Sequence, residues 1–181
     1  MLRFFVLFMV LVLGLFALEI TTFAQTHFVL PFTAGLAKVS VFLVLLFDDQ
    51  VAASGKIISS LRNGFAVEIQ PGCNGVEALI ILFSAIMAFP STWKQKAVGL
   101  GIGFFAIQGL NLVRIISLFY MGQYSMTVFK WFHLYLWQAL IILDALVVWL
   151  LWLRWINRTT PAASATAATA TAPSAEPVSS S

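Results

Sequence analysis

The stretch QPGCNGVEALIILFSAIMAFP, residues 70–90, contains the features that decide the fold. A proline and two glycines surround Cys73, which is the only cysteine of the sequence. Glu77 follows one turn later, and an apolar run then continues to Pro90. Such a run is typical of a helix that enters a bilayer. The stretch therefore predicts a membrane helix with a thiol and a carboxylate at its mouth.

The composition of the whole chain supports a membrane protein. Of 181 residues, 61% are hydrophobic and 9% are charged, whereas a soluble domain carries about 25% charged residues. A soluble core cannot absorb this much apolar surface, so we expect an integral membrane protein surrounded by lipid. The net charge is only +3, and the basic residues are spread over loop ends, which argues against nucleic acid as a partner.

Five apolar segments are spaced along the chain, and they cover residues 2–21, 32–47, 73–89, 98–120 and 132–153. The first could be a signal peptide, but its apolar run exceeds the roughly 7–15 residues typical of one, so we interpret it as an uncleaved anchor. The second is short for a span and contains Lys38.

Basic residues predict the orientation, because they gather on the cytoplasmic side of membrane helices. The basic residues beside the segments are Arg3, Lys94, Lys96, Arg154 and Arg158. They place both ends of the membrane region in the cytoplasm, which five complete spans cannot satisfy. We therefore expect the second segment to lie at the outer surface or to enter and return. The alternative is five spans with the N-terminus outside. Either way, Cys73 and the predicted loop 121–131 face outward.

A polar stretch, residues 48–72, separates the second and third segments. Within it, Asn63 and Gly64 lie between two β-prone runs, which predicts a small β-hairpin over residues 55–70. The hairpin could hold an extended peptide by β-pairing, or it could be purely structural. The predicted fold is thus an all-α polytopic membrane protein with four or five transmembrane helices and a small extracytoplasmic β-hairpin before the third apolar helix.

Two regions differ in composition. Residues 1–158 form the predicted integral membrane domain, and residues 159–181 are rich in Ala, Thr, Ser and Pro. A segment without core-forming residues cannot offset its chain entropy by apolar burial. We therefore predict a disordered tail over residues 159–181.

Several polar residues agree in depth although they come from different helices. Cys73 and Glu77 begin the third segment, and His133 opens the fifth. Arg114 lies inside the fourth segment, three residues after Asn111 and on the same helical face. An ionisable group in hydrocarbon costs roughly 2.5–3.5 kcal/mol, so this agreement is unexpected for unrelated residues.

Gly103 shares the face of Arg114, which predicts close packing against another helix. Asp144 lies eleven residues after His133, roughly 16 Å further in, and we interpret it as a hydrogen-bonding group within the bundle.

A thiol, a base and a cation together suit acyl transfer. The thiolate of Cys73 would attack a peptide carbonyl, His133 would assist proton transfer, and Arg114 would stabilise negative charge or align the peptide. A helix N-terminus and a nearby arginine predict a lowered pKa for the thiol. The simpler alternatives are an inert packed cysteine, an Arg114 that only pairs with Glu77, and an interfacial histidine. The set is too small for a zinc site, so we predict neither a metal nor a cofactor.

At these residues the sequence resembles the exosortase/archaeosortase family of polytopic membrane enzymes. The family pattern is Cys-x-Gly at the outer start of a helix, Asn-x-x-Arg in the next helix, and a histidine at the following outer mouth. Here the matching letters are CNG at Cys73, NLVR from Asn111 to Arg114, and His133, within residues 30–155. The stretches PGCNGVEA, with Asn74 where serine is commoner, and QGLNLVRIISLFYMGQ are most similar to the exosortase H subfamily.

The resemblance implies a multi-pass cysteine protease or transpeptidase of the bacterial inner membrane with its active site facing the periplasm. Its substrates would be exported proteins ending in an IPTL-type sorting tail, which consists of a short motif, a membrane helix and a basic end. The enzyme would cleave the tail through a cysteine acyl-enzyme and transfer the protein to an acceptor. A substrate held by its own membrane helix has a raised effective concentration at the site.

The resemblance also implies site residues. The implied catalytic residues are Cys73, Arg114 and His133. The implied supporting residues are Asn74, Gly75, Glu77 and Asn111. Two other classes of function stay open on the residues alone. One is a small membrane transporter that uses Arg114 with Glu77 or Asp144 as an ion-coupled pair, and the other is a non-enzymatic envelope-assembly scaffold.

Overall fold

The computed structural model describes residues 2–159, so the tail predicted over 159–181 lies outside the described residues from residue 160 onward. The helices are α1 Leu2–Glu19, α2 Thr22–Ala24, the π-helix η1 Gln25–Val29, α3 Leu30–Val44, α4 Val76–Ala88, α5 Trp93–Tyr124, α6 Met126–Trp131, the π-helix η2 Phe132–Leu136 and α7 Trp137–Thr159. The strands are β1 Val51–Ser54, β2 Ile57–Ser60 and β3 Ala66–Glu68.

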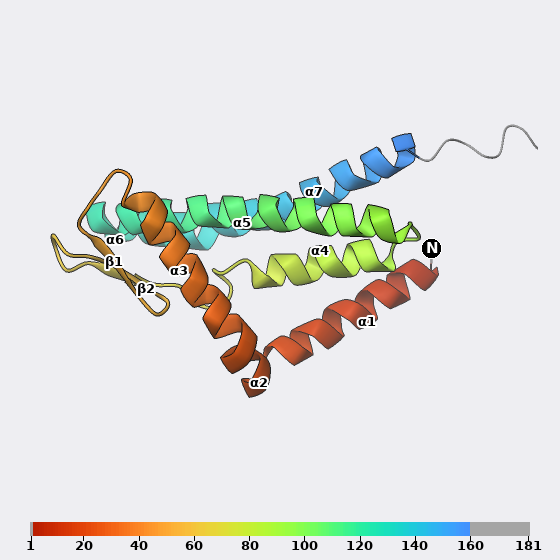
Figure 1. Ribbon diagram of the computed structural model, residues 1–181, viewed down its shortest axis with the longest axis horizontal. Helices are drawn as coiled ribbons and strands as arrows, with labels where there is room; N and C mark the ends of the chain where they lie inside the picture. The colour runs from red at the N-terminus through yellow and green to blue at the C-terminus, as the bar shows by residue number, and fades with distance from the viewer. Residues whose placement is uncertain (1, 160–181) are drawn as a thin grey trace, which may run out of the picture.

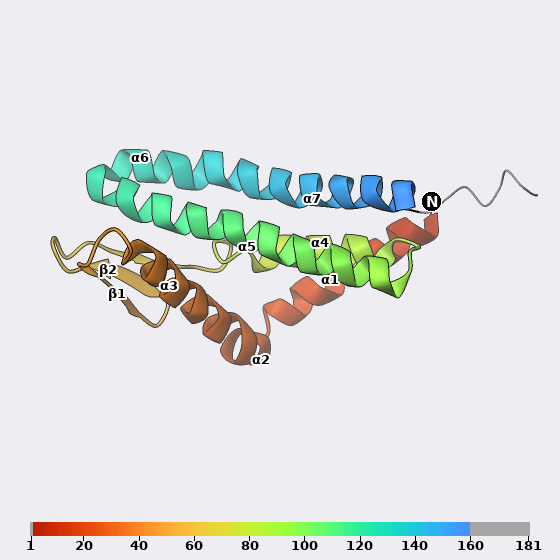
Figure 2. The same ribbon diagram turned by 45° about the horizontal axis from the view of Figure 1, so that its top comes forward.

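Helices α1, α4, α5 and α7 pack alongside one another and form the body of the molecule (Figure 1). Helix α4 contacts α1, α5 and α7, and α5 also packs along α7. The chain bends sharply at α2, so that α3 diverges from α1 and reaches the end of the molecule that carries the sheet (Figure 2). Four segments of the described residues are long and apolar enough to cross a membrane, namely Leu2–Glu19, Thr22–Val44, Trp93–Tyr124 and Met126–Arg158. The prediction of an all-α polytopic membrane protein is confirmed.

The second apolar segment is longer than its pattern suggested. The helix begins at Thr22, where the Thr21 hydroxyl accepts a hydrogen bond from the backbone of Ala24, and it continues through η1 to Val44. The run of 23 residues is long enough to cross a membrane, so shortness is no argument against its crossing. The sequence pattern did not indicate this start, because polar residues interrupt the apolar run before residue 32. His27, for example, lies within 3.0 Å of the carbonyl oxygen of Phe23 on the preceding turn. By contrast α4 has only 13 residues.

The predicted hairpin is present, and a further strand extends it. Strands β2 and β3 pair antiparallel, with Ile58 opposite Val67, and Gly64 in the turn has a φ of +71°. Strand β1 pairs with the other side of β2, giving the order β1-β2-β3. The prediction missed β1 because its sequence, VAAS, is half alanine, which is depleted in strands. The sheet packs its buried side chains, such as Ile58, against α3 and α5 around Phe119.

Helix α5 connects the two ends of the molecule, since 32 residues at about 1.5 Å each span about 48 Å. It begins with a capping box between Thr92 and Gln95. The predicted close packing at Gly103 is confirmed, because a Cβ there would lie 2.2 Å from the Leu82 side chain of α4. The predicted loop 121–131 is wrong. Helix α5 continues to Tyr124, and α6 starts two residues later, after an extended residue at Ser125.

Candidate active site

Cys73 lies in a tight loop between β3 and α4. Two glycines of this loop, Gly72 and Gly75, have φ values of +83° and +75°, a left-handed conformation that favours glycine. The Cys73 amide donates to the carbonyl of Gln70, and the Asn74 side chain accepts from the amide of Val76. The letters PGCNG therefore encode a turn that presents the thiol just before α4 begins.

The three predicted catalytic residues meet at this thiol. The sulfur of Cys73 is 3.7 Å from Nε2 of His133 and 3.5 Å from Nη2 of Arg114. These residues belong to the β3–α4 loop, η2 and α5, respectively. Side chains separated by 41 and 60 positions in the chain thus converge on one sulfur atom.

Arg114 is a buried cation that no carboxylate neutralises within residues 2–159. Its side chain is 1% exposed, its Nη1 is 3.5 Å from the carbonyl oxygen of Gly72, and its Nε has no hydrogen-bond partner. The alternative pairing with Glu77 is wrong, because the Glu77 carboxylate instead accepts a hydrogen bond from the Gly72 amide. A buried unpaired charge is costly. The arginine therefore favours the appearance of negative charge at the neighbouring sulfur or at an oxygen bound beside it.

The predicted lowering of the thiol pKa is also wrong. Burial raises the pKa of the Cys73 thiol, the charge of Arg114 acts in the opposite direction, and the charge of Glu77 adds to the rise. Removing the sulfur from water disfavours the thiolate more than one cation favours it. A raised pKa favours the protonated thiol, so a reaction that used this sulfur as a nucleophile would need a base.

His133 is placed to be that base. It lies in η2, a single π-helical turn that joins α6 to α7, and π-helical turns occur frequently at functional sites. Its ring stacks on Phe129 with centroids 5.6 Å apart and planes within 9°. This stacking holds the imidazole with both ring nitrogens within 4.0 Å of the sulfur. The sequence indicated the residue but gave no signal for the π-helical turn.

A buried network of hydrogen bonds joins the thiol loop to α3 and α5. Asn74 is fully buried, and its side chain donates to the Thr33 hydroxyl while its carbonyl accepts from Gln108. Gln108 in turn accepts from Asn111. Asn74, Gly75 and Asn111 therefore support the loop, whereas His133 and Arg114 approach the sulfur. Thr33 and Gln108 were missed, although Gln108 precedes Asn111 by three residues on the same face of α5.

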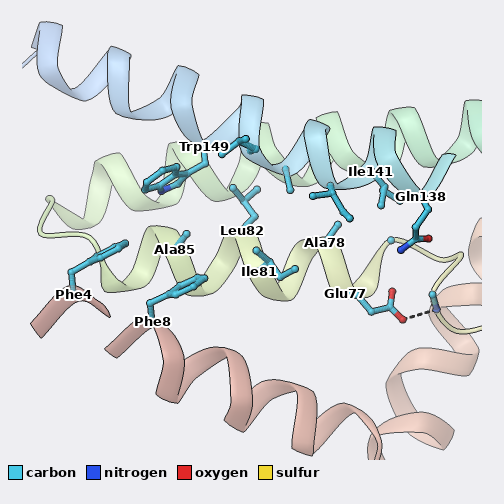
Figure 3. A pocket seen from close by; sticks show the side chains of 15 residues that line it. Phe4, Phe8, Glu77, Ala78, Ile81, Leu82, Ala85, Gln138, Ile141 and Trp149 are labelled. Atoms are coloured by element: carbon cyan, nitrogen blue, oxygen red, sulfur yellow. Dashed lines mark hydrogen bonds between the residues drawn. The ribbon is translucent and has the colours of Figure 1, made fainter. Parts of the chain in front are cut away.

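Two cavities border the loop. The smaller, of about 220 Å³, is lined by Cys73, Arg114 and His133 together with Glu68 of β3 and its neighbours. The larger, of about 550 Å³, is almost entirely apolar and lies between α1, α4 and α7. In Figure 3 its aromatic lining lies at one end and Glu77 and Gln138 lie at the other, beside the loop. The thiol loop thus lies between the cleft that contains the three side chains and a larger, apolar cavity.

Comparisons with known proteins identify the family of the chain. No curated protein and no solved structure matches the chain. A family model described as transmembrane exosortase matches residues 2–136, which include Cys73, Arg114 and His133. The match covers 135 of the 181 residues. The chain therefore belongs to the transmembrane exosortase family.

Proposed function

We propose that the protein is a membrane cysteine peptidase or transpeptidase that cleaves the C-terminal sorting tails of exported proteins. The observation that carries this proposal is the convergence of a buried, unneutralised Arg114 and of His133 on the single thiol of the chain. Membership of the exosortase family supports the same reaction class. The similarity of PGCNGVEA to exosortase H supports an IPTL-type tail as the substrate.

The proposed reaction begins with proton transfer from Cys73 to His133 as the sulfur attacks the scissile carbonyl carbon. Arg114 stabilises the developing oxyanion or thiolate, because its charge lies in a dry environment where it acts strongly. The C–N bond then breaks, His133 returns the proton to the leaving amine, and a thioester to Cys73 remains. Water or an acceptor amine attacks the thioester, with His133 taking the proton of the acceptor, and the thiol is restored.

The apolar cavity supports a substrate with a membrane segment, and the basic residues of α5 support a site that faces the periplasm. An apolar cavity beside the thiol loop suits a substrate that carries a membrane segment, and a shared bilayer raises the effective concentration of such a substrate. Lys94 and Lys96 lie at the start of α5, more than 15 residues before Arg114. By the positive-inside tendency, that end of α5 is cytoplasmic. Cys73 would then open to the periplasm from the inner membrane of a bacterium.

The test is cleavage of an exported reporter with an IPTL-type tail, co-expressed with the protein at matched membrane levels. We expect Cys73→Ala to abolish cleavage and His133→Ala to slow it by about 10²–10⁴-fold. His27→Ala is the matched control, because His27 is the other histidine of the chain and is exposed. Arg62→Gln, an exposed arginine, is the corresponding control for Arg114→Gln. Cleavage that persists in Cys73→Ala would overturn the proposed mechanism.

A further inference from the structure

We infer that the open edge of β3 binds the segment of the substrate just upstream of the scissile bond, as a fourth strand of the sheet. The inference rests on the proposed function, since it assumes a peptide substrate for Cys73. It adds the element that holds the peptide, the backbone groups that bind it and the direction in which it runs.

The backbone of β3 has one satisfied edge and one open edge. The amide of Ser60 donates to the carbonyl of Phe65, and the amide of Ile69 donates to the carbonyl of Lys56. Antiparallel pairs alternate between bonded and non-bonded positions. Phe65, Val67 and Ile69 thus direct their backbone groups toward β2. Ala66 and Glu68 direct theirs to the other side, where no strand of residues 2–159 pairs with them.

The open edge borders the catalytic cleft. The residues of β3 and its extension that line the cleft with the catalytic side chains are Val67, Glu68, Ile69 and Gln70. Gln70 is linked to Cys73 by the hydrogen bond from the Cys73 amide to the Gln70 carbonyl. A peptide that pairs with this edge is therefore led directly to the sulfur. Extended peptides commonly bind in this way, with backbone groups supplying affinity.

The edge also lacks two of the features that commonly block pairing, namely proline and a bulge. Exposed sheet edges are usually protected by proline, bulges or covering elements. Strand β3 contains no proline, and its ladder with β2 is regular over Ala66–Glu68. The charge of Glu68 is neutralised by Lys56 of β2 at 2.7 Å. An edge without these two features, beside the Cys73 sulfur, is suited to bind a peptide.

The direction of pairing follows from the position of β3 along α5. Just before β3, the Asn63 side chain donates a hydrogen bond to Gln123, near the end of α5. After β3, Cys73 contacts Arg114, which lies nine residues before Gln123 in the same helix. Strand β3 therefore runs from the outer end of α5 toward the middle of the molecule. A substrate whose C-terminal tail enters the membrane runs the same way. The added strand is thus parallel to β3.

The inference can be tested in a chain without other thiols. Cys73→Ala removes the only cysteine, so that a single new thiol reports on its surroundings. In this background we introduce Ala66→Cys or, on the other edge strand, Ser54→Cys as the matched exposed control. The probe is the IPTL-tailed reporter carrying one cysteine at successive positions upstream of the motif. Oxidative cross-linking in membranes should occur for Ala66→Cys at a narrow set of reporter positions and should be absent for Ser54→Cys.

A second arm measures cleavage with the native thiol. Ala66→Pro removes an amide from the open edge and leaves the ladder with β2 intact, since prolines are tolerated on edges. Ala53→Pro is the matched control, because Ala53 occupies a non-bonded position in β1 at the far edge. We expect Ala66→Pro to slow reporter cleavage roughly two- to tenfold relative to Ala53→Pro, the effect of one lost backbone hydrogen bond.

The outcomes separate the inference from the proposed function. Cross-linking at Ala66→Cys together with a selective effect of Ala66→Pro supports the added strand. If the wild type cleaves the reporter and Cys73→Ala does not, while neither edge variant differs from its control, the peptide binds elsewhere and the inference fails alone. If the wild type does not cleave the reporter and no cross-link forms, the proposed function and the inference both fail.

Discussion

Gly75→Ala provides a quantitative test of how the thiol loop is held. Gly75 has a φ of +75°, and a Cβ at this position would lie 2.9 Å from Nε2 of Gln108. That nitrogen donates the hydrogen bond to the carbonyl of Asn74. Gly72→Ala is the matched control, because Gly72 has a similar φ of +83° but a Cβ there would meet nothing within 4 Å.

The magnitude follows from two contributions. A non-glycine residue in the left-handed region costs about 1–2 kcal/mol, and both variants incur this cost. Only Gly75→Ala also displaces Gln108, which leaves the buried Asn74 carbonyl unpaired at about 1–3 kcal/mol. Since about 1 kcal/mol shifts the melting temperature by roughly 2–4 °C at this chain length, Gly75→Ala should melt roughly 2–12 °C below Gly72→Ala.

The assay is thermal unfolding of the purified proteins in the same detergent, followed by the intrinsic fluorescence of the six tryptophans. Reporter cleavage at a temperature where both variants are folded adds a second readout, and Gly75→Ala should be the slower of the two. Equal melting temperatures and equal cleavage would refute the reasoning, because they would show that the contact with Gln108 does not hold the loop.

Three further predictions concern the thiol and the long helix. Because burial raises the pKa of Cys73, the rate of its alkylation by a maleimide should still increase with pH at pH values where the rate for an ordinary cysteine has levelled off. A plateau at neutral pH would contradict this. Glu77→Gln should speed alkylation at neutral pH and Arg114→Gln should slow it, because the two charges shift the thiol pKa in opposite directions; a change of the same sign in both would count against this electrostatic account. Thr92→Ala should lower the free energy of unfolding by about 1 kcal/mol through loss of the capping box of α5, and cleavage by the folded protein should stay unchanged because Thr92 lies at the far end of that helix from Arg114.

The membrane class and the three residues that meet at the thiol could be predicted from the sequence because both depend on strong local signals. Long apolar runs indicate spans directly. Cys73, Arg114 and His133 were recognisable because ionisable groups are rare in such runs. The Asn63-Gly64 turn likewise predicted the pairing of β2 with β3, which the structure confirms.

The parts that were missed depend on contacts between distant segments. The pKa of Cys73 depends on burial by several elements, which the dipole argument from α4 alone could not include. The hydrogen bond between Asn74 and Thr33 joins residues 41 positions apart, and no local pattern indicates it. The early start of the second helix at Thr22 was hidden by its polar residues, such as His27, whose ring lies within 3.0 Å of the carbonyl oxygen of Phe23 on the preceding turn.

The central claim is that Cys73 forms a thioester with the substrate, and nucleophile capture tests it most directly. Membranes containing the protein and the tailed reporter are incubated with hydroxylamine, and the new C-terminus of the released reporter is determined by mass spectrometry. The account predicts a hydroxamate at this C-terminus, formed only when Cys73 is present, because a thioester is open to attack by the added nucleophile. A free carboxylate as the only product, formed equally by Cys73→Ala, would contradict it.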